Sequence, residues 1–175
     1  QQTDHDGAYG GIAGFRYDDM TSSDHRWIKA TYWSMVERVD RQVGRMLEAL
    51  SASGQRDNTL IIFTSDHGEM LGDHGIYLKG PYFYDCAIRV PLLIAGPGVT
   101  PGLKTDALTE LTDLAPTILD AAGIPIEPGM QGRTLLPLLA GETTEHRQSV
   151  YCEFYGANFT YEPHAFTTMV RTDEH

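Results

Sequence analysis

The sequence lacks two features that would place a protein in a large class at once. It has no apolar run near the ~20 residues that a membrane-spanning helix requires, so no spanning segment is expected. Basic residues are also few: 13 Lys and Arg stand against 24 Asp and Glu, which gives a formal net charge of −11 at pH 7. This charge argues against a nucleic-acid backbone or an anionic membrane as the main partner. An anionic substrate would therefore need cations concentrated locally.

Several catalytic and metal-binding motifs are missing as well. The sequence contains no His-Glu-x-x-His, Cys-x-x-Cys, Gly-x-Ser-x-Gly or Walker sequence. An EF-hand loop beginning at Asp66 would need Gly at its sixth position and Glu at its twelfth, where Leu71 and Tyr77 stand. The two cysteines, Cys86 and Cys152, lie far apart in unlike contexts, so two separate thiols are expected rather than a disulfide.

What the sequence does contain is an alternation of helical and strand patterns. Apolar residues at gaps of three and four predict a helix of about 28 residues that begins near Ser23 or Asp24 and ends before Gly54. The remaining elements are predicted strands at 59–64, 90–96, 149–154 and 165–170 and short helices at 112–123 and 132–141. The first two strands are continuous apolar runs, which are typical of central strands covered on both faces. These patterns predict an α/β fold with a mixed, mostly parallel sheet flanked by helices.

The first of these strands ends on residues that carry chemistry. The segment TLIIFT (59–64) runs directly into Ser65, Asp66 and His67. In parallel α/β sheets, ligands bind at the carboxyl ends of strands. A carboxylate beside an imidazole suits a divalent cation, although such a pair can equally cap a turn or face solvent. The Asp-His-Gly sequence repeats at 73–75, which favours the metal interpretation.

Lys79 is the third element of this stretch. A lone lysine is usually a solvated surface charge, but this one follows a glycine-rich loop and precedes the aromatic segment GPYFYD (80–85). A positioned ammonium group beside a metal ion would neutralise charge on the non-bridging oxygens of a tetrahedral ester.

The sequence resembles the C-terminal, metal-site part of the sulfatases, which belong to the alkaline-phosphatase superfamily together with the phosphonate monoester hydrolases. The resemblance covers residues 26 to about 155 and implies an alkaline-phosphatase-like fold. It rests on five segments in the expected order: YWSMVERVDRQVGRMLEAL (32–50), DNTLIIFTSDHGEMLGDHGIYLKG (57–80), RVPLLIAGPGV (89–99), LTDLAPTILDAAGI (111–124) and MQGRTLLPLLAG (130–141).

The resemblance implies a role for four residues of this loop. Asp66 and His67 match the ligands of a single divalent cation, for which calcium is favoured and manganese or zinc are the alternatives. Lys79 matches the lysine that contacts the sulfate and the nucleophile. His74 matches a histidine often found on this loop and is included as a catalytic candidate without an assigned role.

Two further family motifs are absent. Sulfatases use an N-terminal Asp-Asp pair for the metal and a formylglycine nucleophile made within Cys-x-Pro-x-Arg, and neither Cys86 nor Cys152 begins that sequence. His5 and His25 lie near the place of the family's leaving-group histidine, but neither is in a matching motif. Residues 1–175 are therefore expected to form one partial sulfatase-like catalytic domain, truncated at both ends.

Three functions remain open at this point. The first is part of a metal-dependent enzyme that hydrolyses sulfate esters of small molecules or glycans. The second is a phosphonate or phosphate diester hydrolase of the same superfamily. The third is an inactive fragment that folds and self-associates through an exposed sheet surface, as a homo-oligomer.

Overall fold

The computed structural model describes residues 17–155 and 166–172. The chain divides into two compact units. The described residues of the first unit are 17–54, 67–90, 154–155 and 166–167, and those of the second are 55–66, 91–153 and 168–172. Each unit is described below by itself.

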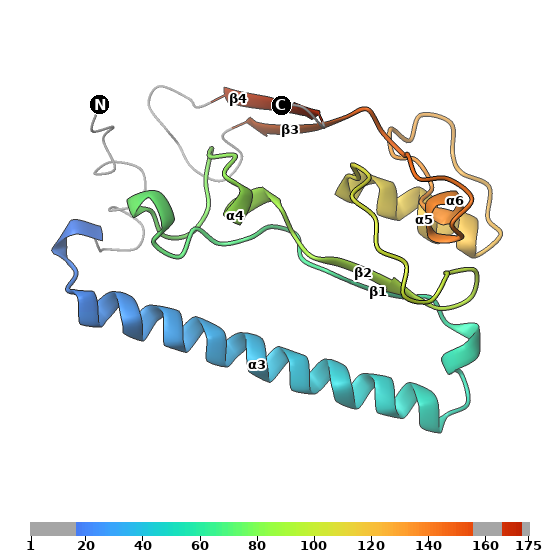
Figure 1. The fold of residues 1–175 in the computed structure, drawn as a ribbon, viewed down its shortest axis with the longest axis horizontal. Coiled ribbons are helices and arrows are strands. Elements are labelled where there is room, and N and C mark those ends of the chain that lie inside the picture. Colours follow the sequence, from blue (N-terminus) through green and yellow to red (C-terminus); the bar gives the residue numbers. More distant parts are fainter. Residues whose placement is uncertain (1–16, 156–165, 173–175) are drawn as a thin grey trace. The chain divides into compact units, whose positions relative to one another are not determined.

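The longest element is helix α3, Ser22–Ala52, which confirms the predicted long helix (Figure 1). The predicted caps, Ser23 and Asp24, are wrong by a few residues: Thr21 is the N-cap. Its backbone N–H donates to Asp24 Oδ2 at 2.8 Å, and Asp24 N–H donates to Thr21 Oγ1 at 3.3 Å. This reciprocal capping box satisfies two backbone donors that the helix leaves unpaired. Gly54 follows the last turn with a φ of +71°, the left-handed conformation that glycine adopts without strain.

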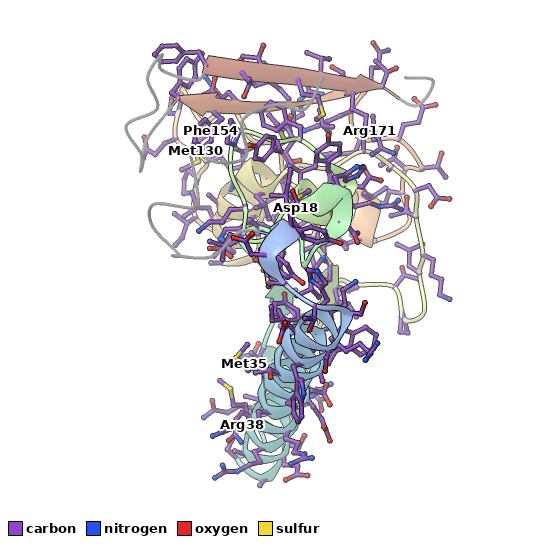
Figure 2. All side chains as sticks on the ribbon, turned by 90° about the vertical axis from the view of Figure 1, so that its left-hand side faces the viewer. Asp18, Met35, Arg38, Met130, Phe154 and Arg171 are labelled. Atoms are coloured by element: carbon purple, nitrogen blue, oxygen red, sulfur yellow. The ribbon has the colours of Figure 1, made fainter. Side chains whose placement is uncertain are left out.

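The apolar stripe of α3 is only partly covered. No residue of the helix is buried. Six large apolar side chains of the helix are more than half exposed: Trp27, Trp33, Met35, Val36, Val39 and Met46. Figure 2 shows Met35 and Arg38 projecting from the helix. An amphipathic helix normally buries such a stripe, so this surface of α3 is an unusually apolar one.

Strands β1, Ile61–Thr64, and β2, Leu92–Ala95, form an antiparallel pair in which Ile61 lies opposite Ala95 (Figure 1). Both strands were expected, but burial on both faces was not found. Phe63 is 40% exposed and Leu93 is 60% exposed, because each strand has a single neighbour among the described residues. The mostly parallel sheet that was predicted does not occur in residues 17–155 and 166–172, whose sheets have two strands each.

The second unit contains the two predicted short helices. A 3-10 turn, Leu111–Asp113, leads into α5, Leu114–Ala121, which lies against α6, Leu136–Leu139. Strand β3, Ser149–Tyr155, pairs with β4, Phe166–Thr172, as the second sheet. None of the helices in the described part of the chain is long and apolar enough to cross a membrane.

Each unit has a small core of its own. In the first unit, Met70, Ile76 and Ala87 are buried together, with Tyr82, Cys86 and Ile88 packed against them; a further short helix here is α4, Asp85–Ile88. In the second unit, Leu135 and Leu138 are buried. Cys86 and Cys152 form no disulfide, as predicted.

Candidate functional site

The predicted metal ligands lie just past the carboxyl end of β1. Asp66 and His67 are consecutive residues that follow Thr64 after one intervening serine, and both are exposed. Ser65 Oγ lies 3.5 Å from Asp66 Oδ1. Their placement at the end of this strand is as predicted, and their accessibility leaves both side chains within reach of a dissolved cation.

The His67 ring has a defined tautomer. Its Nδ1 lies 2.7 Å from the carbonyl oxygen of Gly68. Because a carbonyl can only accept, Nδ1 must carry the proton, so in the neutral ring Nε2 carries the lone pair. Histidines that bind metals commonly donate their other N–H to a backbone carbonyl in this way. The donor chemistry of Asp66 and His67 therefore fits a divalent cation, with one carboxylate and one imidazole nitrogen.

Gly68 is required at its position by close packing. A Cβ there would lie 1.9 Å from the carbonyl oxygen of Cys86, and the Gly68 N–H donates to the carbonyl oxygen of Ala87 at 2.7 Å. Two backbone segments approach here too closely for any side chain.

The loop between Gly68 and Lys79 is closed by its own backbone. Met70 N–H donates to Leu78 O at 3.0 Å, and Gly72 N–H donates to Ile76 O at 2.8 Å. Three residues in this loop other than glycine have a positive φ: Leu71 at 48°, His74 at 57° and Leu78 at 67°. Such conformations are rare for leucine and tend to occur near functional sites, where the surrounding structure holds them.

His74 and Lys79, the remaining predicted residues, are both exposed. The His74 ring stacks on Tyr84, with ring centroids 3.8 Å apart and an interplanar angle of 14°. This contact gives His74 a fixed position on the loop. The predicted convergence of Lys79 with His67 in one cleft stays a prediction.

The described residues do not bring together a complete set of metal ligands. Within residues 17–155 and 166–172, no group of three or more His, Cys, Asp or Glu side chains could hold a metal ion. A cavity of about 630 Å³ lies in the second unit, and Asp66, His67, His74 and Lys79 are not among its lining residues. The residues that line this cavity include Leu92, Val99, Leu103, Leu135 and Leu138.

A contact that sequence reasoning missed ties the start of α3 to this loop. His25 Nδ1 lies 2.7 Å from the Tyr77 hydroxyl, and the two rings stack with an interplanar angle of 7°. Tyr17 packs against both rings. Tyr77 is 7% exposed, and burial raises the pKa of its hydroxyl. His25 was considered as the leaving-group histidine; here it has a structural partner.

The second unit holds a buried charged cluster that the sequence did not reveal. The Asp113 carboxylate, which is 0% exposed, accepts hydrogen bonds from Arg147 Nε at 3.0 Å and from the backbone N–H groups of Arg133 and Glu110 at 2.8 and 2.9 Å. His146 Nε2 lies 3.1 Å from the same carboxylate. Burial alone would raise the pKa of Asp113, but the Arg147 guanidinium and the backbone donors outweigh it and lower this pKa to about 2.

This cluster is structural because every group in it faces an internal partner. Glu110 Oε2 lies 3.4 Å from the Arg147 guanidinium. The Thr117 hydroxyl donates to Asp113 O at 2.6 Å and accepts from Leu135 N–H at 2.9 Å. These bonds join the start of α5 to the segment that precedes α6, and they leave Asp113 no access to solvent.

The helices and strands define an α/β protein, and comparison with known proteins identifies its family. The sulfatase family model matches residues 13–124, so the chain belongs to the sulfatase family. It is 38% identical over 148 residues to a choline-sulfatase of Rhizobium meliloti and 36% identical over 163 residues to arylsulfatase K of Gallus gallus.

Solved structures agree with this assignment. A phosphonate monoester hydrolase of Agrobacterium radiobacter is 41% identical, with a TM-score of 0.72 over 78% of this chain and 28% of that one. A protein solved in complex with its substrate D-glucosamine-2-N,6-O-disulfate is 33% identical, with a TM-score of 0.69 over 78% of this chain and 28% of its own. The choline-sulfatase match covers 83% of this chain and the arylsulfatase K match 89%, but the chain spans less than a third of either relative's length (28% and 30%).

Proposed function

We propose that this chain is part of a metal-dependent sulfatase that hydrolyses sulfate esters, and that the loop after β1 supplies part of its active site. The observation that carries the proposal is the order of residues on this loop in a chain of the sulfatase family. Asp66 and His67 follow the strand end, and the exposed Lys79 follows a loop whose backbone is held in strained turns.

In this proposal Asp66 and His67 hold the cation through a carboxylate oxygen and Nε2. We favour calcium, with manganese or zinc as alternatives. When bound, the cation would polarise the non-bridging oxygens of the ester. Two protein donors are fewer than the six or more oxygens of a tight calcium site or the three protein ligands of a catalytic zinc site, so further ligands are required from elsewhere in the protein.

Lys79 would supply a second positive charge beside the cation. Its ammonium would donate hydrogen bonds to the sulfate and stabilise the negative charge that builds up on the oxygens as the ester bond breaks. This local cation also offsets the net charge of −11, which would otherwise repel an anionic substrate. We assign His74 a place on the same loop surface, with its ring held by Tyr84.

The relatives support the proposed substrate class. Sulfate esters of small molecules or glycans fit the choline-sulfatase and the disulfated glucosamine complex. A phosphonate or phosphate ester is the second candidate, because two of the similar solved structures are phosphonate monoester hydrolases. Both substrates present tetrahedral oxyanions, so Lys79 and the cation would serve either one.

The exposed apolar surfaces suggest how the chain behaves alone. In the full protein we infer that β1 and β2 belong to a larger, mostly parallel sheet. Without it, the open strand edges and the apolar stripe of α3 favour self-association, and the chain itself should lack turnover. Light scattering that shows a monomer at high concentration would contradict the self-association.

The activity test compares an aryl sulfate with a phosphonate monoester as substrates of the full-length protein that carries this chain. We expect the sulfate to be the better substrate and Lys79→Ala to lower its kcat/KM by about 100-fold or more. The exposed lysine Lys104, which lies outside this loop in the sequence, provides the control: Lys104→Ala should leave the rate unchanged. Preference for the phosphonate would support the second candidate, and an active Lys79→Ala enzyme would refute the role of Lys79.

A further inference from the structure

We propose that Glu69 is a positioning residue for Lys79, because its carboxylate holds the two strained turns of the loop that ends at Lys79. The inference rests on the proposed role of Lys79 in contacting the sulfate. It adds a residue that lies outside the metal ligands and the substrate contacts described above.

One carboxylate oxygen of Glu69 joins the two ends of the loop. Glu69 Oε1 accepts a hydrogen bond from Leu71 N–H at 3.1 Å and a second from Leu78 N–H at 2.5 Å. The neighbouring bond from Met70 N–H to Leu78 O, at 3.0 Å, closes the same loop from its backbone. Glu69 therefore connects residues that are seven positions apart in the sequence.

Both residues that Glu69 contacts are strained. Leu71 has a φ of 48° and Leu78 a φ of 67°, in the left-handed region where a leucine side chain crowds its own backbone. Such conformations persist only where other interactions hold them. Hydrogen bonds to a charged carboxylate are among the strongest available for this purpose.

The consequence reaches Lys79 through the peptide bond. Lys79 directly follows Leu78, so the backbone dihedrals of Leu78 set the direction in which the chain enters Lys79. Relaxation of Leu78 to a negative φ would redirect the lysine backbone. A displacement of about 1 Å in a positioning group can lower a rate by about 100-fold, which makes such a constraint functionally important.

The base of the loop is also held by contacts that do not involve the Glu69 side chain. Glu69 N–H donates to Cys86 O at 3.0 Å, and Met70 is 0% exposed in the core. The side chain of Glu69 can therefore be changed while the segment that carries it remains anchored. This separation allows the role of the carboxylate to be tested apart from the fold.

The test uses NMR on the 175-residue chain, with inorganic sulfate as the probe and the Lys79 side-chain signals as the reporter. Hydrogen exchange of the Leu71 and Leu78 amides is measured on the same samples. Glu69→Ala should remove the protection of both amides and weaken sulfate binding at Lys79 by about tenfold, the equivalent of one charge-assisted hydrogen bond. Glu69→Gln should fall between Ala and the wild type, because its carbonyl oxygen still accepts both bonds.

Two further variants separate positioning from general loosening. Tyr77→Phe removes the hydrogen bond to His25 but leaves the ring stacking and the Glu69 bonds, and sulfate binding should stay within about twofold of the wild type. Leu78→Gly removes the steric reason for strain and should lose sulfate affinity through added backbone freedom. If Glu69→Ala binds sulfate as the wild type does, or if Tyr77→Phe weakens binding equally, positioning by Glu69 is refuted.

The failure of the proposed function would look different. If sulfate produces no saturable shift at Lys79 in the wild type and Lys79→Ala also leaves kcat/KM of the full-length protein unchanged, the role of Lys79 fails and the positioning role of Glu69 falls with it. If only the shift is absent, Glu69→Ala must lower kcat/KM of the full-length protein, and an unchanged value refutes the role of Glu69. If sulfate shifts Lys79 in every variant alike, the function stands and only the role of Glu69 is overturned.

Discussion

The loop after β1 and the Asp113 cluster use charged residues in opposite ways. In the loop, Asp66, His67 and Lys79 are exposed, and the backbone is strained at Leu71 and Leu78. In the cluster, Asp113 is fully buried and its carboxylate is surrounded by hydrogen-bond donors.

The burial of a charged side chain separates a structural role from a binding role in this chain. A carboxylate whose acceptor positions are all occupied by internal donors stabilises the fold but has no capacity left for a ligand. Exposed groups on a strained loop contribute little to stability but can bind something from outside. Variants of the two regions should therefore affect different measurements.

The largest effect on stability is expected from the cluster. Asp113→Ala removes the main partner of the largely buried Arg147 guanidinium, leaving only Glu110 beside it, and should lower the free energy of unfolding by about 4 kcal/mol. Urea unfolding of the chain measures this change. Asp106→Ala, an exposed aspartate in the same unit, should change stability by less than about 0.5 kcal/mol. Equal losses of stability in the two variants would contradict the structural role of the Asp113 cluster.

The second-largest loss of stability is expected from the loop after β1, where two backbone segments pack closely. Gly68→Ala places a Cβ 1.9 Å from Cys86 O, and the shift needed to relieve this clash should cost about 3 kcal/mol. Gly44→Ala, in the middle of α3 where nothing lies within 4 Å, should instead stabilise the chain slightly, by up to about 1 kcal/mol. Thermal unfolding of both variants checks the pair, and a neutral Gly68→Ala would contradict the packing described.

Acid should weaken the cluster selectively. The pKa of Asp113 is lowered from an ordinary value of 3.8 to about 2, so its ionised form is favoured by folding. This stabilisation is complete above about pH 4 and is lost as the pH falls through about 2, with a total of about 2 kcal/mol. In Asp113→Asn this part of the acid sensitivity should disappear. A variant with the same acid unfolding profile as the wild type would contradict the assignment.

The smallest stability effect concerns the contact between α3 and the loop. Tyr77→Phe removes the hydrogen bond to His25 and should cost about 1 kcal/mol. Tyr84→Phe, which keeps the stacking on His74, serves as the matched control and should be nearly neutral. Differential scanning calorimetry can resolve the two stability changes. A larger loss of stability from Tyr84→Phe than from Tyr77→Phe would contradict the role of the Tyr77 hydroxyl.

Local patterns predicted most of the helices and strands. The helix α3, both strands of each pair and the two short helices were found close to their predicted places, because periodicity and capping residues are local signals. Pairing is not a local signal. The apolar run of β1 gave no indication of its antiparallel partner or of its exposure, since both depend on what lies beside the strand.

The site was predictable only in part. Asp66, His67 and Lys79 could be proposed from their residue types and spacing and His74 from the family resemblance, and their roles stay predictions. Glu69 and Asp113 could not, because their importance lies in backbone N–H groups that converge on them after folding.

The measurement closest to the central claim is metal binding at the end of β1. Titration of the 175-residue chain with manganese, followed by paramagnetic broadening of its NMR signals, reports where a weakly held cation resides. We predict that the amides of residues 65–68 broaden first and that Asp66→Asn with His67→Ala abolishes the effect. Broadening that begins elsewhere on this acidic chain, or that survives the double substitution, would contradict the assignment of the loop as the metal site.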